Sequence, residues 1–156
     1  MTEKARLKGS LRVDVFDCRR HCGTKIRTMR STRWHKNIVT TAGLSAVRDI
    51  LAGYAKPPTA IAYGVGTTVA ELTDTGLADE IGRVDLIRRT RPNAFSVRFQ
   101  AFLPESHESN GSSITEAGLV NSTAADSGVL FARVLFDSIE KTPSVSVTFT
   151  WQWTIA

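Results

Sequence analysis

The stretch Val145-Ser146-Val147-Thr148-Phe149-Thr150-Trp151-Gln152-Trp153-Thr154-Ile155 decides the fold that we expect. Apolar side chains occupy every second position, with serine, threonine and glutamine between them. Successive side chains of a β-strand point to opposite faces, so this period of two predicts one long strand with a single buried face. We expect that face to hold core residues, with Phe149, Trp151 and Trp153 as the candidates and Val145, Val147 and Ile155 beside them.

Shorter stretches upstream predict the neighbours of this strand. Alternating or continuous apolar runs occur in residues 60–68, 83–90, 95–102, 114–120 and 129–136, with short polar segments between them. The polar segment 104–111 ends in Asn110-Gly111, a pair that favours a hairpin turn. Several strands with short connections are typical of a sandwich, and a long last strand needs neighbours to avoid an exposed edge. The sequence therefore predicts a mainly β fold, an antiparallel β-sandwich.

One segment changes period and predicts a helix at about residues 41–52. Its apolar residues recur at the spacing of one helix face, at Leu44, Val47, Ile50 and Leu51. Thr40 or Thr41 is suited to cap the start of this helix, and Gly53 to close its end.

The N-terminal quarter differs from the rest of the chain in charge. Residues 1–37 contain eleven Lys and Arg against three Asp and Glu, a net charge of +8, whereas residues 38–156 contain nine against twelve, a net charge of −3. Leu11, Val13 and Val15 alternate with polar residues and Gly23 favours a turn, which together predict a basic N-terminal β-hairpin. We therefore divide the chain into a basic arm, residues 1–36, and a β-sandwich domain, residues 37–156, which we expect to fold without the arm. The candidate docking residues of the arm are Arg12, Arg19, Arg20, Lys25, Arg27, Arg30 and Arg33.

Motifs for chemistry are not evident in this chain. The two cysteines, Cys18 and Cys22, lack the second ligand pair of a zinc site, so we expect thiols beside a turn and no metal or cofactor, with a disulfide or ligand role left open. The sequence has no Gly-x-Ser-x-Gly motif and no His with a nucleophile at recognisable spacing, so an enzyme is not expected. Apolar runs of membrane-spanning length and a secretory signal are not found either, which predicts no membrane partner and assembly in a cytoplasm.

Glu116 stands out because it lies inside the otherwise apolar segment 114–120. Strand alternation places it with Ile114 and Gly118, in a position that is at least partly buried. A buried carboxylate needs an arginine or backbone partner, so the sequence predicts a structural ion pair at Glu116.

Several segments in a fixed order resemble a family of small structural proteins of tailed bacteriophages. They are AGL at 42–44, YGVGTT at 63–68, TDTGL at 73–77, NGSSITEAGL at 110–119, LFARVLF at 130–136, IEKTP at 139–143 and VTFTW at 147–151. The resemblance covers about residues 37–155, and the segment 18–22 (CRRHC) does not match it. It implies a virion component without known catalysis, associated with tail or fibre genes, that is assembled in the host cytoplasm and has other phage virion proteins as partners.

Three functional hypotheses follow from the residues and the resemblance. The first is a tail-associated protein, for fibre attachment or at the baseplate or neck periphery, that docks through strand edges and the basic arm in a symmetric homo-oligomer. The second is a capsid decoration or cement protein. The third is a nucleic-acid-binding module that uses the basic arm.

Overall fold

A computed structural model describes the backbone of residues 6–21 and 24–156, and the side chains of these residues except 19–21 and 24–27. This part of the chain contains ten strands and one helix. The elements are β1 (Leu7–His21), β2 (Thr24–Ser31), β3 (His35–Lys36), β4 (Ile38–Val39), α1 (Thr41–Leu51), β5 (Ala60–Gly64), β6 (Glu80–Asn93), β7 (Ser96–Leu103), β8 (Ser113–Val120), β9 (Leu130–Glu140) and β10 (Val145–Ile155).

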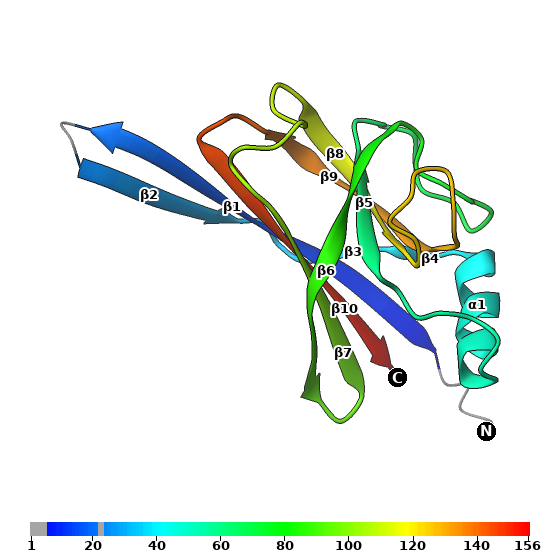
Figure 1. Ribbon diagram of the computed structural model, residues 1–156. Helices are drawn as coiled ribbons and strands as arrows, with labels where there is room; N and C mark the ends of the chain where they lie inside the picture. The colour runs from blue at the N-terminus through cyan, green and yellow to red at the C-terminus, as the bar shows by residue number, and fades with distance from the viewer. Residues whose placement is uncertain (1–5, 22–23) are drawn as a thin grey trace.

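The strands form one antiparallel sheet that curls into two packed layers (Figure 1). The strand order is β2-β1-β10-β7-β6-β5-β8-β9-β4. Strand β6 belongs to both layers, because its residues 80–85 pair with β5 and its residues 86–93 pair with β7. On the opposite side, β3 pairs with β1 while β4 pairs with β9, so residues 35–39 also join the layers. The prediction of a mainly β antiparallel sandwich with an N-terminal hairpin is confirmed.

Strand β10 is the centre of the first layer and supplies much of the core. Phe149 and Trp151 are fully buried, and Trp153 is 6% exposed. Trp153 reaches from one layer to the other, since its ring centroid lies 5.8 Å from that of Phe99 on β7 and 5.8 Å from that of Phe131 on β9. The exception on the predicted face is Ile155, which is 61% exposed because it lies at the end of the strand, past the core.

Helix α1 confirms the predicted helix to within one residue at its end. The side chain of Thr40 caps the helix by accepting a hydrogen bond from the Gly43 amide, at 2.9 Å. The backbone of Phe131 on β9 lies so close to Gly43 that a side chain there would overlap it. Helix α1 thus packs on the second layer through a glycine contact.

The predicted hairpin at Asn110-Gly111 is wrong. Gly111 does adopt a turn conformation, with φ of 94°. However, β7 pairs with β6 and β10, and β8 pairs with β5 and β9, so residues 104–112 cross from one layer to the other. The fully buried Lys141 fixes this crossing, because its ammonium group donates to the carbonyl of Glu105 and to the side chain of Asn110, at 3.0 and 2.6 Å.

The predicted division of the chain at residue 36 also has to be corrected. Strand β1 pairs with β10 from Leu7 to Asp17, and Leu11 and Val13 are fully buried in the same core as Phe149. Residues 1–36 are therefore not an arm that can be removed, because residues 7–17 of β1 are part of the body of the sandwich. The part that leaves the body is the end of the β1–β2 hairpin, residues 18–21 and their strand partners 24–27, which lie past the last pair of β1 with β10. At its base the amide of Cys18 still donates to the carbonyl of Ser144, at 2.8 Å.

We expect Trp151→Ala to lower the free energy of unfolding by about 3–5 kcal/mol, because it leaves a large cavity in the core. Ile155→Ala is the matched control on the same strand and should change that free energy by no more than about 0.5 kcal/mol, since its side chain is 61% exposed. Urea denaturation followed by circular dichroism measures both. Equal effects of the two substitutions would contradict the placement of Trp151.

A second pair of variants tests the corrected boundary. Deletion of residues 1–36 should abolish cooperative thermal unfolding, because it removes Leu11 and Val13 from the core and leaves β10 paired on one side only, with β7. In the arm-shortened variant, residues 19–26 are replaced by the dipeptide Asn-Gly, which suits a two-residue turn between the paired Cys18 and Arg27. This variant should keep its cooperative transition, and a folded 37–156 fragment would refute the correction.

Candidate functional site

An ion pair on the outer side of the second layer organises the longest connection of the fold. Glu116 on β8 and Arg133 on β9 are 0% and 2% exposed in their side chains, and a carboxylate oxygen lies 2.8 Å from the guanidinium. Their strand neighbours Ala117 and Ala132 point into the core, which places the pair on the other side of the layer. The buried charges of this pair therefore require partners outside the core.

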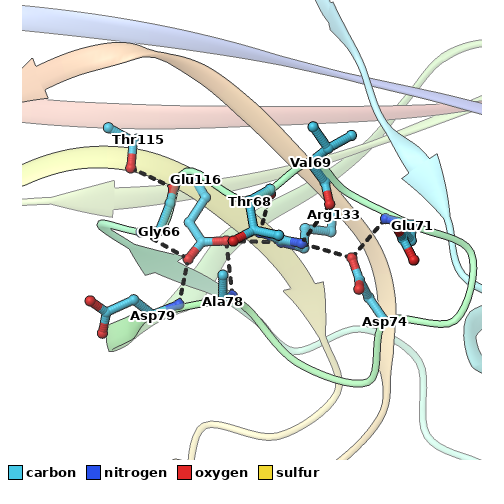
Figure 2. A network of polar contacts seen from close by, with 10 residues as sticks. All are labelled: Gly66, Thr68, Val69, Glu71, Asp74, Ala78, Asp79, Thr115, Glu116 and Arg133. Carbon is cyan, nitrogen blue, oxygen red and sulfur yellow. Dashed lines mark hydrogen bonds and ion pairs between the residues drawn. The ribbon is translucent and has the colours of Figure 1, made fainter.

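The partners come from residues 66–79, which connect β5 to β6 (Figure 2). One carboxylate oxygen of Glu116 accepts hydrogen bonds from the amides of Gly66 and Asp79, at 3.1 and 2.8 Å. The other oxygen accepts from the amide of Ala78 at 3.2 Å. Arg133 donates to the carbonyl of Thr68 at 2.8 Å. The network thus holds both ends of this connection against β8 and β9.

Asp74 completes the network at the outer end of Arg133. Its carboxylate lies 2.8 Å from the guanidinium of Arg133 and accepts from the amide of Glu71 at 2.9 Å. Burial alone would raise the pKa of Asp74, but the Glu71 amide and the charge of Arg133 lower it. Burial alone would lower the pKa of Arg133, but hydrogen bonds to Asp74 and Glu116 and their charges raise it. Each charged form is stabilised by the other.

The placement of Glu116 agrees with the structural ion pair expected from the sequence, and it argues against a reactive group. Each carboxylate oxygen of Glu116 accepts two hydrogen bonds, and the side chain has no exposed surface. Sequence reasoning missed Arg133 and Asp74 as the partners. The signal was available for Arg133, because it is a charged residue inside an apolar strand, as Glu116 is.

The outer side of the first layer carries a second feature, a basic face. Three rows of paired residues cross β1, β10, β7 and β6 on this side, and we define the basic face as these rows: Lys8-Thr154-Ser96-Asn93, Ser10-Gln152-Arg98-Thr90 and Arg12-Thr150-Gln100-Arg88. Residues in one row share a face of the sheet because Leu11 and Val13, between them on β1, point into the core. The rows contain four basic and no acidic residues.

The difference in net charge is larger between the first layer and the rest of the chain than between residues 1–37 and residues 38–156. The strands of the first layer, with β6 counted from residue 86, hold twelve Lys and Arg and two Asp and Glu, a net charge of +10. The rest of the chain holds eight and thirteen, a net charge of −5. Counting along the chain missed Arg88, Arg89, Arg91 and Arg98, which lie in the negative portion of the sequence but join the N-terminal strands in space.

The predicted docking residues do not lie together on one arm. Arg12 belongs to the basic face, where it pairs with Asp14 at 3.1 Å and lies over the ring of Trp34, 5.3 Å from its centroid. Arg98 lies over the same ring, at 5.8 Å. Arg30 and Arg33 are exposed near the base of the hairpin. The other four belong by their backbone to the strands of the hairpin end, but their side chains lie outside the described residues: Arg19, Arg20, Lys25 and Arg27.

The end of the β1–β2 hairpin, which we call the ribbon (residues 18–21 and 24–27), projects from the body on the left of Figure 1. Its four residue pairs continue past the last pair of β1 with β10, Asp17 and Val145. At about 3.3 Å per residue, the ribbon extends about 13 Å from the body. The ribbon is joined to the basic face through strand β1, on which Asp14 and Asp17 lie between Arg12 and the ribbon.

Comparisons with protein-family models, with curated proteins and with solved structures find no match to this chain. Among the described residues, no three His, Cys, Asp or Glu side chains are grouped as metal ligands. In the same part of the chain, no helix has the length and apolar character that crossing a membrane requires. Cys22 lies outside the described residues, so the expectation for Cys18 and Cys22 stays a prediction.

We expect Arg133→Met to lower the free energy of unfolding by about 3–5 kcal/mol, because it leaves the carboxylate of Glu116 buried without its counter-charge. Arg48→Ala removes an arginine whose side chain is 73% exposed in its ion pair with Asp49, and it should cost no more than about 0.5 kcal/mol. Urea denaturation compares the two variants. Similar small effects would mean that the network does not hold the fold.

The lowered pKa of Asp74 gives a prediction for pH. A carboxyl whose pKa is lower in the folded state stabilises the fold above its ordinary pKa of 3.8, and this contribution disappears as the pH falls through the lowered value. Asp74→Asn should therefore cost about 1.5–3 kcal/mol at neutral pH and progressively less below the ordinary value. Thr75→Ala, at an exposed position in the same connection, is the control and should cost the same small amount at every pH. A cost of Asp74→Asn that does not vary with pH would contradict the assignment.

Proposed function

We propose that this protein is a structural component of a tailed-bacteriophage virion, associated with the tail, that acts by docking onto other virion proteins. The observation that carries the proposal is the ribbon of residues 18–21 and 24–27, which projects from a closed sandwich and is joined to its basic face through strand β1. We place the docking function in this ribbon and not in a pocket. The proposal includes no catalysis and no cofactor.

The physical state of the ribbon supports a docking role. An isolated two-stranded hairpin is only marginally stable in water, and the outer edge of β2 pairs with no other strand among the described residues. An unpaired edge is a template for a strand or a surface of another chain. Met29 of β2, which lies beside the base of the ribbon, is 60% exposed. Docking would bury these groups and stabilise the ribbon.

The resemblance to phage structural proteins supports the same role, and it rests on residues of the second layer. The segments that carry it include Gly66, Thr68 and Asp74 in the connection, Glu116 on β8 and Arg133 on β9, which together form the polar network. These residues build a scaffold. The resemblance therefore lies in the residues that hold the fold. The segment 18–22, in the part that we propose to dock, falls outside it, which fits a family whose members share a fold and differ in what they attach to.

The proposal is tested on purified virions. Mass spectrometry should detect the chain in the particles, at a dozen or so copies for a tail or neck protein, whereas hundreds of copies would favour the capsid decoration alternative. In a phage that carries the arm-shortened variant, the protein should fold but be absent from the particles. Absence of the native chain from virions, or full incorporation of the variant, would refute the proposal.

A nucleic-acid-binding module is the second candidate, and the net charge of +10 on the first layer favours it. If it holds, the purified chain should bind DNA at about 50 mM salt and lose most of that affinity at about 200 mM. Lys8→Glu/Arg88→Glu, which reverses two exposed charges of the basic face, should weaken that binding further. A chain that does not bind DNA at low salt is not such a module.

A further inference from the structure

We propose that copies of this chain associate head to tail, with the basic face of one copy against the acidic loops of the next. This inference goes beyond the proposed function, because it uses two other surfaces and names the partner, a second copy. It concerns two surfaces on opposite sides of one molecule. The argument depends on where each surface lies, which charges it exposes and which apolar side chains accompany them.

The acidic loops are the connections 65–79 and 121–129, which cover the outer side of the second layer. A small apolar cluster of Ala60, Ala62, Val120 and Leu130, with Leu77 packed against it, lies between these loops and the layer. The loops expose the carboxylates of Glu71, Asp79 and Asp126, which have no ion pair among the described residues. Exposed apolar side chains accompany them, with Val69 at 75% and Leu72 at 59%.

The acidic loops are held in place, which suits them to bind a partner without loss of flexibility. The network of Glu116, Arg133 and Asp74 fixes the connection 65–79 from below. Arg83 on β6 holds the second loop, since it donates to the carbonyls of Ser122 and Ser127, at 3.0 and 2.7 Å, and pairs with Glu80 at the start of β6, at 2.6 Å. A hollow of about 450 Å³ lies between the loops, lined in part by Asp79 and Asp126. A preorganised surface loses little entropy on binding.

The basic face has the opposite charge and lies on the opposite side of the sandwich. Its four basic residues, Lys8, Arg12, Arg88 and Arg98, stand on the outer side of the first layer, with Ile87 and Phe95 of the β6–β7 hairpin exposed at 67% and 69%. In Figure 1 the ribbon and the β6–β7 hairpin point to the left and downward, away from the loops on the right.

This arrangement disfavours a two-fold dimer through either surface, because a two-fold axis would bring like charges together. Contact between unlike surfaces is heterologous, and it closes into a ring or continues as a stack, according to the rotation between copies. A nucleic acid would match the basic face alone. It would leave the exposed apolar side chains of both surfaces and the acidic loops without a role, whereas a second copy uses all of them.

The test uses the full chain in sedimentation velocity at about 50 and about 500 mM salt. We expect oligomers at low salt and an apparent dissociation constant that rises about tenfold or more at high salt, because the contact is between exposed charges. Two variants locate the surfaces. Lys8→Glu/Arg88→Glu reverses the basic face, and Glu71→Lys/Asp79→Lys reverses the acidic loops, and all four positions are exposed.

Each variant alone should remain a monomer, and an equimolar mixture of the two should associate again, because one intact basic face then meets one intact set of acidic loops. Glu108→Lys/Glu140→Lys is the control, since it makes the same change in net charge as Glu71→Lys/Asp79→Lys but at exposed positions outside both surfaces. It should associate as the native chain does. A native chain that is monomeric at low salt, a mixture that stays monomeric, or a control that fails to associate would overturn the inference. Association only after addition of DNA would overturn it in favour of a nucleic-acid partner.

The result is independent of the proposed function. A chain that is found in virions but is monomeric in this test retains its virion role and loses the head-to-tail contact. A chain that associates in this test but is absent from virions shows the reverse.

Discussion

The burial of one face of β10 is the constraint on which the structure depends. Phe149, Trp151 and Trp153 leave water only if strands flank β10 on both sides and a second layer covers their rings. Strands β1 and β7 supply the flanks. The second layer supplies Phe131, which meets Trp153, and Tyr63, whose ring stacks on Phe149 with centroids 6.4 Å apart. The closure of the sheet by β6 on one side and by β3 and β4 on the other follows from the need to keep these rings covered.

The ribbon is a consequence of the same constraint. Strand β1 has fifteen residues, but β10 pairs with eleven of them, from Leu7 to Asp17. The remaining residues, 18–21, extend past the end of β10, and among the described strands β2 alone pairs with them. Strand β1 therefore has two structurally different parts. Leu11 and Val13 hold the fold, and the residues after Asp17 extend past the partner strand β10.

The sequence predicted the elements that depend on the local spacing of apolar residues. It did not predict which strands pair with one another. Alternation predicted β10 and its buried aromatic residues, and helical spacing with Thr40 and Gly53 predicted α1. Glu116 was found because a carboxylate among apolar residues has few explanations. The hairpin at Asn110-Gly111 was wrong because a turn conformation does not determine which strands pair, and here Lys141 directs the chain to the other layer. The domain boundary was wrong because basic composition marked the whole N-terminus, although Leu11, Val13 and Val15 of β1 are in the core.

The two charged surfaces have different physical origins, and this difference matters for function. The basic face is the solvent side of an antiparallel layer, where polar residues are expected and where arginines of β1, β6 and β7 align by register. The acidic side is made of connections, which would be mobile without support. Inside them, Arg133 is neutralised by Glu116 and Asp74, so the interior pair contributes no free positive charge to that side. The carboxylates that face solvent are then those not used by the network. The charges of Glu116, Arg133 and Asp74 thus hold the loops, whereas other carboxylates of the loops face solvent. The two outer sides of the sandwich therefore differ in the sign of their charge.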